Sequence, residues 1–453
     1  MTSFSTRAMG RTLWQQTWPM AMGVMALLGF NLVDSIFVAR LGTQPLAAQS
    51  FTFPVTFIII GVQVGMGIAI AATISRALGA GEHERARRLG SLILCGGGII
   101  MALLMVVLWF VQGPVFAAMG AGDDILAVIR TYWWPWLLAS WMGAMLYFGY
   151  SLFRAHGEAR FPGIIMIVTS LLNLVLDPLL IFGVGPFPGL GLPGAAWATL
   201  IAFTGGILLV GRKLGRQDWL SFHHLGEEAR RSSGPFLHIA GPAMVSQLMP
   251  PASALLATSV VARLGNAAVA SWGLASRLET FVLLVVLALT MSLPPWLGRN
   301  YGAGKWRETR QLMNLAVRVV LIWQFTLGVV VAVLAAPIAG LMTGDDAVRD
   351  SLTTLMRFLL PSYAFLGICM LVVSASNALG WPMKAMLISF LRLFACYLPC
   401  LWIGSLVAGL TGLAAGAALG NVLAGIMAWR LYRHSLGERG KSSEDEAALE
   451  PVK

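Results

Sequence analysis

Charged residues are scarce in this sequence: they make up 11% of its 453 residues, whereas 57% are hydrophobic. A soluble domain carries about 25% charged residues to keep its surface hydrated. The scarcity of charge therefore excludes an ordinary soluble globule. Cysteine is also scarce, without metal-site spacing or a disulfide framework, so we expect small packing residues at the four positions Cys95, Cys369, Cys396 and Cys400.

The hydrophobic residues form long runs separated by short polar clusters. A helix needs about 20 apolar residues to cross the hydrocarbon core of a bilayer, and these runs are of that length. The pattern predicts an all-α integral membrane protein with twelve transmembrane helices, at 18–39, 46–73, 90–111, 131–153, 162–183, 190–212, 236–262, 268–297, 312–338, 353–377, 384–406 and 409–431.

The net charge of +11 is distributed unevenly between the two sets of loops. With these helices, one set holds 23 Lys and Arg residues and the other holds four, Arg40, Arg130, Arg263 and Arg349. Basic loops stay in the cytoplasm, so both termini are predicted to be cytoplasmic and the membrane to be the inner membrane of a bacterium. The basic excess thus indicates topology, and we expect no nucleic-acid partner.

An internal repeat appears when the chain is shifted by 223 residues. Ala39–Gly42 then falls on Ala262–Gly265, Gly79–Gly81 on Gly302–Gly304, and Pro19 on Pro242. Two pseudo-symmetric lobes of six helices follow, which is a recurring transporter plan. We expect a cytoplasmic N-terminus at 1–17, lobes at 18–213 and 235–432, a cytoplasmic linker at 214–234 and a disordered cytoplasmic tail at 433–453.

Two acidic residues interrupt the apolar runs of the first lobe. Asp34 lies in the first predicted helix and Asp177 in the fifth, whereas the repeat places Ala257 and Cys400 at the corresponding positions of the second lobe. A charge inside the bilayer costs about 2.5–3.5 kcal/mol, so it needs a reason. Both carboxylates are predicted at the same depth near the outer surface, where they would favour a shared proton or cation.

Amides and prolines flank both acids. Asn31 is one helical turn from Asp34, and Asn173 is one turn from Asp177 on the same helix face. Pro178 follows Asp177 directly, and proline removes a backbone hydrogen bond. We therefore interpret Pro178, and Pro19 in the first helix, as conformational hinges beside a site for H⁺ or Na⁺. The simpler alternative is that each Asp accepts a hydrogen bond from a neighbouring helix.

Glu279 is the other deep acid, near the middle of the eighth predicted helix. Arg277 is two residues away and does not face it on a helix, whereas Arg392 is a candidate partner. Glu279 is either part of a structural ion pair or a carboxylate with a role in substrate binding or coupling.

These residues in their order resemble the multidrug and toxic compound extrusion (MATE) family. The resemblance covers the chain from Pro19 to about Arg433. It is carried by Asp34–Gly42 at the end of the first helix, by the repeat, and by the loops Gly79–Gly81 and Tyr301–Gly304. Asn173 and Asp177, with the proline that follows, resemble the DNA-damage-inducible (DinF-like) branch.

The resemblance implies two six-helix lobes around a cleft and export of organic cations or other amphipathic compounds in exchange for H⁺ or Na⁺. It implies cation-binding roles for Asp34, Asn173, Asp177 and Thr199, and a bend of the first helix at Pro19. It implies no cofactor and no metal other than Na⁺ at those four residues. The acids that another branch carries in helices seven and ten are missing here, which leaves Glu279 as the candidate of the second lobe.

The predicted function is therefore that of a secondary active antiporter, acting as a monomer in the lipid bilayer and not as an enzyme. One rival is a lipid-linked oligosaccharide flippase of the same superfamily, which requires a strongly cationic cavity. The other is a polytopic enzyme that binds Mg²⁺-diphosphate through paired acids. The pairs Asp123–Asp124 and Asp345–Asp346 lie in predicted external loops without a neighbouring basic cluster, which disfavours the enzyme.

Overall fold

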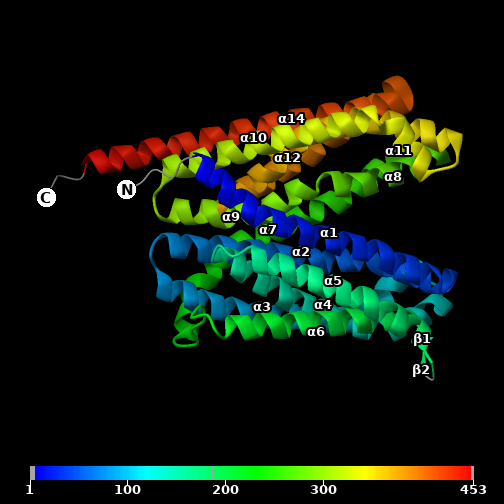
Figure 1. Cartoon of the computed structure of the whole chain (residues 1–453), viewed down its shortest axis with the longest axis horizontal. Helices are drawn as coiled ribbons and strands as arrows, with labels where there is room; N and C mark the ends of the chain where they lie inside the picture. Colours follow the sequence, from blue (N-terminus) through cyan, green and yellow to red (C-terminus); the bar gives the residue numbers. More distant parts are fainter. Residues whose placement is uncertain (1–5, 186, 450–453) are drawn as a thin grey trace. The chain divides into compact units, whose positions relative to one another are not determined.

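The computed structural model describes residues 6–185 and 187–449 of the chain. Its helices divide into two compact units (Figure 1). The first unit runs from Thr12 to Gln247, and the second comprises the remaining described residues.

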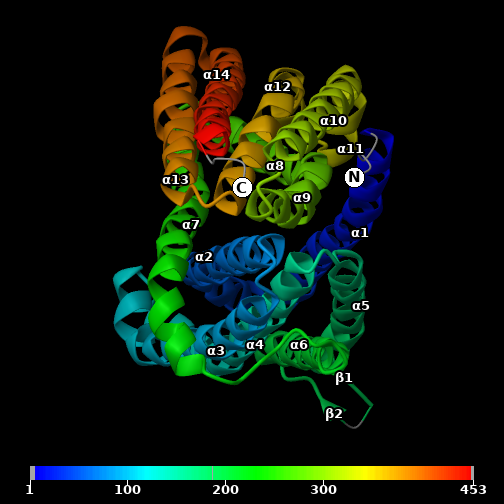
Figure 2. The same cartoon turned by 90° about the vertical axis from the view of Figure 1, so that its left-hand side faces the viewer.

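The first unit holds the site predicted from the sequence. Its helices pack mainly as α2 against α4, α4 against α6, and α5 against α6, and Figure 2 shows them nearly end on. Its elements are α1 (Thr6–Ala39) from Thr12 onward, α2 (Thr43–Gly79), α3 (His83–Ala118), α4 (Asp123–Ala155), α5 (Arg160–Phe182), β1 (Gly183–Val184), β2 (Phe187–Pro188), α6 (Leu192–Leu214) and the first part of α7 (Leu225–Ala262).

The second unit repeats the plan with more interruptions. α12 is its central helix, packed against α14, α10 and α8. Its elements are α8 (Asn266–Val282), α9 (Leu284–Gly302), α10 (Trp306–Val333), α11 (Ala335–Met342), α12 (Asp346–Ala378), α13 (Pro382–Phe390), the π-helix η1 (Leu391–Tyr397) and α14 (Leu398–Leu449).

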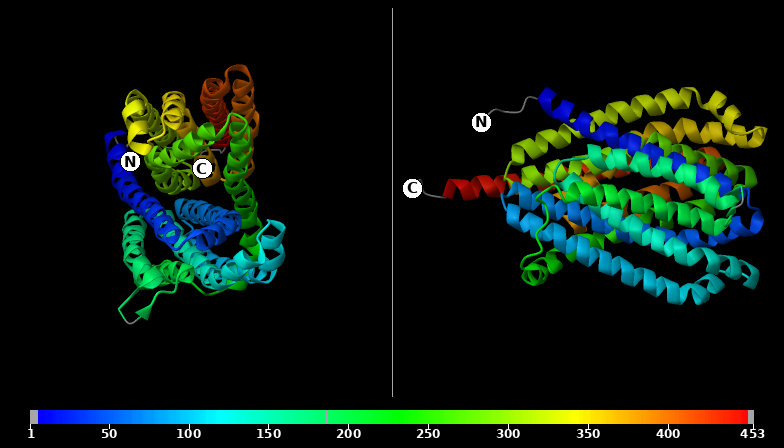
Figure 3. Two further views of the ribbon diagram at one scale, coloured as in Figure 1. Left: turned by 90° about the vertical axis from the view of Figure 1, so that its right-hand side faces the viewer. Right: turned by 60° about the horizontal axis from the view of Figure 1, so that its bottom comes forward.

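These helices supply the predicted twelve membrane spans. In the part of the chain that the structure describes, nine helical segments are long and apolar enough to cross a membrane, and α8 with α9, bent by 44°, makes a tenth. α4 is less apolar than these segments, but its 33 residues are long enough to cross and contain the predicted span 131–153. The segment Pro382–Gly437 contributes two, because Ala408 and Gly409 inside α14 have non-helical backbone angles. Within each unit the long helices lie side by side, as the right-hand view of Figure 3 shows. The prediction of an all-α, twelve-helix membrane fold is confirmed.

The break in α14 creates a helical hairpin whose two arms touch along glycines. A Cβ added at Gly416 would collide with the carbonyl oxygen of Cys400, and one at Gly420 would come within 2.7 Å of the Cα of Tyr397. Small residues let membrane helices approach to backbone contact. The predicted separation into helices at 384–406 and 409–431 is therefore correct, although the polypeptide is helical on both sides of a very short turn.

The internal repeat also appears in the backbone. Gly42 and Gly265 precede α2 and α8 with φ of 112° and 104°, and Gly81 and Gly304 follow α2 and α9 with φ of 80° and 70°. Each pair is related by the same shift along the sequence. Because residues with a Cβ rarely adopt such angles, glycine in both copies preserves the same turns.

The first unit extends beyond the predicted boundary. We expected a linker at 214–234, but α7 already begins at Leu225. The early part of α7 packs onto α2, where Ile239 and Ala240 form a buried cluster with Ala69 and Ala72. Apolar contact with α2 thus assigns this part of α7 to the first unit.

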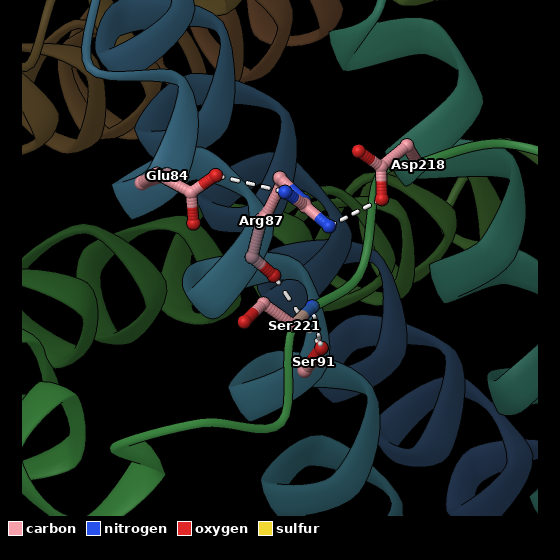
Figure 4. Close-up of polar contacts among 5 residues, drawn as sticks. All are labelled: Glu84, Arg87, Ser91, Asp218 and Ser221. Atoms are coloured by element: carbon pink, nitrogen blue, oxygen red, sulfur yellow. Dashed lines mark hydrogen bonds and ion pairs between the residues drawn. The ribbon is translucent and has the colours of Figure 1, made fainter.

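The short connection that remains between α6 and α7 is held against the start of α3. Arg87 forms ion pairs with Glu84 and with Asp218, and the backbone N–H of Ser221 donates a 2.9 Å hydrogen bond to the Ser91 hydroxyl (Figure 4). Trp219 stacks on the His156 ring, with centroids 4.0 Å apart. The connector is thus a packed part of the first unit.

Two further features were not predicted from the sequence. β1 and β2 form a small antiparallel hairpin beyond the end of α5 (Figures 2 and 3). Residues 433–449, expected to belong to a disordered tail, continue α14 as helix, while residues 450–453 lie outside the described residues. Helix continuation from a long preceding helix costs no new nucleation, which accounts for the difference.

Candidate functional site

Asp34 and Asp177 lie together inside the first unit. Each is five residues before the end of its helix, α1 at Ala39 and α5 at Phe182. The two carboxyl groups are close enough for the charge of Asp34 to act on Asp177 electrostatically. Asp177 is completely buried, whereas Asp34 is partly exposed. The two acids that the sequence singled out therefore lie near each other within the first unit.

Asn173 and Thr199 extend the site by one helical turn. The amide nitrogen of Asn173 donates a 3.1 Å hydrogen bond to the hydroxyl oxygen of Thr199, which in turn donates to the carbonyl of Ala195 at 3.0 Å. Asn173 is 2% exposed and Thr199 8%. This chain of bonds uses one N–H of the Asn173 amide and the Thr199 hydroxyl proton, and it leaves the amide oxygen of Asn173 available.

Three oxygens at the site are buried and lack a donor. Among the described residues, no group donates a hydrogen bond to Oδ1 or Oδ2 of Asp177 or to Oδ1 of Asn173. Buried acceptors are nearly always paired, so three in one place require an explanation. Two carboxylates and an amide oxygen are suitable ligands for a hard cation such as Na⁺, and a proton shared by the two carboxyl groups would serve the same purpose.

Two residues near Asp34 were not found from the sequence. Gln49 of α2, 6% exposed, directs its amide nitrogen at the Asp34 carboxylate from 3.5 Å. Tyr132 of α4, 2% exposed, is close enough for an electrostatic interaction with Asp34. Both come from helices whose register against α1 has no local sequence signal. A polar glutamine at a buried position of an apolar helix is the only hint that was available.

The predicted hinge prolines occupy different places. Pro178 lies inside α5, directly after Asp177, and Pro19 lies inside α1, which continues through it. At Pro19, α1 meets α5 at backbone distance, because a Cβ on Gly163 would collide with the Pro19 carbonyl and one on Gly23 would come within 2.8 Å of the Gly163 carbonyl. This contact fixes α1 to α5 on the N-terminal side of Asp34. A bend of α1 at Pro19 would therefore change the position of Asp34 relative to Asp177.

Asn31 and Glu279 do not join this site. Asn31 is exposed, and its side chain makes no hydrogen bond with another described residue; only its backbone carbonyl accepts one, from Ser35. Glu279 belongs to the second unit, where it accepts a 3.0 Å hydrogen bond from the Tyr363 hydroxyl. Of the sequence-predicted site residues, the structure thus brings together Asp34, Asn173, Asp177 and Thr199.

Comparisons with known proteins agree with this architecture. The MatE family model matches residues 19–179 and 242–403, two segments that begin at the two prolines related by the repeat. The chain is 34% identical over 430 residues to a protein of Shewanella oneidensis named FAD transporter, covering 93% of this chain and 94% of that protein. It is 25% identical over 397 residues to the multidrug export protein MepA of Staphylococcus aureus, covering 87% of each.

A solved structure shows the same fold. The crystal structure of the MATE transporter VcmN of Vibrio cholerae in its bent form superposes with a TM-score of 0.93 and 47% identity, over 96% of this chain and 99% of that one. These relatives are transporters, not enzymes. The twelve helices, the repeat and the family match together lead to one conclusion. The chain is a multi-pass membrane transporter of the MATE family.

Proposed function

We propose that this protein is a cation-coupled antiporter that exports cationic or amphipathic compounds in exchange for H⁺ or Na⁺, with no enzymatic activity. The observation that carries the proposal is the Asp34–Asp177 pair, together with the buried oxygens of Asp177 and Asn173 that lack a donor among the described residues. A structural role alone would leave these acceptors bonded. An exchangeable cation would bind these oxygens during part of the transport cycle.

The exchange works through competition and a change in α1. A cation that binds between Asp34 and Asp177 cancels their repulsion and draws α1 toward α5. Movement of α1 about Pro19 then removes Asp34 from the position that a cationic cargo requires. Differential binding of the ion to the two positions of α1 is what drives the change.

The available free energy depends on the stoichiometry. A one-for-one exchange of single charges is driven by the proton gradient alone, at about 1.4 kcal/mol per pH unit. An exchange that moves net charge also uses about 2.3 kcal/mol per charge per 100 mV. We place the protein as a monomer in the inner membrane with both termini in the cytoplasm, as the distribution of Lys and Arg supports.

The deciding experiment is transport in liposomes with the two gradients set independently. Purified protein is reconstituted, and ethidium movement is followed under a pH gradient without Na⁺ and under a Na⁺ gradient at constant pH. If transport is coupled, ethidium should accumulate against its own concentration gradient when either the pH gradient or the Na⁺ gradient is applied. Equal, dissipative movement under both conditions and without any gradient would overturn the proposal.

A second candidate cargo is a dinucleotide, which the relative named FAD transporter supports. The buried Arg154 of α4, 4% exposed, donates to the Ser151 hydroxyl at 2.7 Å and lies over the Tyr147 ring. No described carboxylate forms an ion pair with it. A phosphate group would be a suitable counter-ion. Competition of FAD with ethidium in the same liposomes distinguishes the two cargoes.

A further inference from the structure

The second unit contains a polar cluster of its own, separate from the Asp34–Asp177 site. Glu279 of α8 accepts its 3.0 Å hydrogen bond from Tyr363 of α12, and Arg392 of η1 acts on the same carboxylate electrostatically. Tyr363 is 3% exposed, whereas Glu279 is partly exposed. Three helices thus converge on one partly exposed carboxyl group.

Each of the three residues lies at an irregularity of its helix. Glu279 is three residues before the end of α8, where the chain bends by 44° into α9. Tyr363 is two residues after Pro361 inside α12, and Arg392 lies in the π-helix η1. π-helical turns are frequent at functional sites, and broken helices line the binding sites of transporters.

The carboxylate is not neutralised by a direct ion pair. Within the described residues, no ion pair joins Glu279 to Arg392 or to Arg277, and only one of its two oxygens accepts a hydrogen bond. Arg277 is exposed. The neighbouring Gln324 of α10 bonds the Val282 carbonyl at 3.0 Å instead, so it stabilises the bend and not the acid.

The fold itself does not require an acid here. In the repeat, the position of Glu279 corresponds to Thr56 of α2. Thr56 accepts a 3.2 Å hydrogen bond from the Trp136 indole. An uncharged side chain therefore occupies the corresponding position in the first unit. A carboxylate in a membrane span costs several kcal/mol that a threonine would not.

We propose that Glu279 binds the cationic group of the exported compound, with the Tyr363 hydroxyl orienting the carboxylate. Arg392, whose charge acts on this carboxylate, stabilises it when the cargo leaves. The inference rests on the proposed function, since it assigns cargo binding to the second unit and coupling-ion binding to the first. An organic cation suits this site, because one carboxylate oxygen of Glu279 has no hydrogen-bond donor among the described residues and can supply charge.

The test compares a cationic with a neutral ligand. Binding of ethidium, a monocation, and of Nile red, a neutral amphipath, to the full-length protein in detergent is measured by fluorescence polarisation. Glu279→Gln is expected to raise the Kd of ethidium about tenfold or more, and to change the Kd of Nile red less than about twofold. Tyr363→Phe should weaken ethidium binding by a smaller factor, and Glu279→Asp should retain part of the affinity.

Glu308→Gln is the matched control, because Glu308 is another carboxylate of the same unit, 42% exposed and paired with Lys305 at 3.7 Å. It should leave both Kd values unchanged. Wild-type affinity for ethidium in Glu279→Gln, or an equal loss of both ligands, would overturn the inference while the proposed function stands. A wild-type protein that binds no ethidium would overturn cation export and, with it, this site. Tyr363→Phe and Glu279→Asp keep the test decisive where Glu279→Gln fails to fold.

Discussion

The amide of Asn173 and the hydroxyl of Thr199 form a 3.1 Å hydrogen bond between α5 and α6, one turn from the buried carboxylate of Asp177. The bond fixes the orientation of the amide, because its nitrogen is the only donor that Thr199 accepts from a side chain in the described part of the chain. The amide oxygen is thereby turned away from Thr199 and stays without a donor. Thr199 thus acts on the site through Asn173.

Thr199→Val tests this relationship. The substitution keeps the shape but removes the acceptor, leaving the Asn173 amide nitrogen buried and unpaired. Loss of about 1–3 kcal/mol in the free energy of unfolding is expected, together with weaker coupling because the amide can now rotate. Thermal unfolding in detergent and gradient-driven ethidium export measure the two effects. Thr199→Ser retains the hydroxyl and should behave as wild type; a Ser variant as impaired as the Val variant would refute the role of the bond.

Neutralising either acid of the pair should disable coupling. Asp34→Asn and Asp177→Asn each remove one of the two negative charges that bind the coupling ion, so gradient-driven export should fall about tenfold or more. The double variant should be no worse than either single one, because the two residues act as a unit. Asp124→Asn, at the exposed start of α4, is the control. Export at full rate in both single variants would contradict a coupling role for the pair.

Local sequence signals were enough to find the acids but not all their neighbours. Asp34 and Asp177 stand out because each charge interrupts an apolar run, and Asn173 follows from helical spacing on the same helix. Gln49 and Tyr132 come from α2 and α4, and their contact with Asp34 depends on how far each helix is displaced along its neighbours. Side-chain packing between helices sets that displacement, and a single sequence does not reveal it.

The same distinction holds for the fold. The twelve spans and the repeat follow from run lengths and from glycines that recur at one spacing. The bend between α8 and α9, the π-helix η1 and the extension of α7 into the first unit do not, since they arise from tertiary contacts. Glu279 illustrates the consequence: the sequence suggested Arg392 as an ion-pair partner, whereas the structure gives the direct hydrogen bond to Tyr363.

The hairpin in α14 should not tolerate a methyl group at its glycine contacts. Gly416→Ala would place a Cβ against the Cys400 carbonyl and push the two arms apart, at an expected cost of about 1–3 kcal/mol. Gly273→Ala in α8 is the matched control, because nothing lies within 4 Å of its added Cβ and alanine favours the helix. The melting temperature of each variant in detergent measures its effect on stability. Equal melting temperatures for the two variants would show that the arms do not approach as closely as described.

The connector between α6 and α7 should be held mainly by Trp219 and not by its surface ion pair. Asp218 is 83% exposed, so the ion pair with Arg87 contributes at most about 1 kcal/mol. Trp219 instead stacks on His156 and meets the Phe153 ring edge-on at 5.1 Å, and its loss removes a large packed surface. Trp219→Ala should therefore open the connector far more often than Arg87→Ala.

Limited proteolysis measures this opening, because trypsin can cut after Arg216 within the connector. Cleavage follows the population of the open form when opening is fast. The cutting rate should rise about tenfold or more in Trp219→Ala and less than about fivefold in Arg87→Ala. The reverse order would mean that charge, and not aromatic packing, holds the connector. A Trp219→Phe variant, which keeps an aromatic ring for His156 to stack on, should restore most of the protection and so separates ring stacking from a general loss of folding.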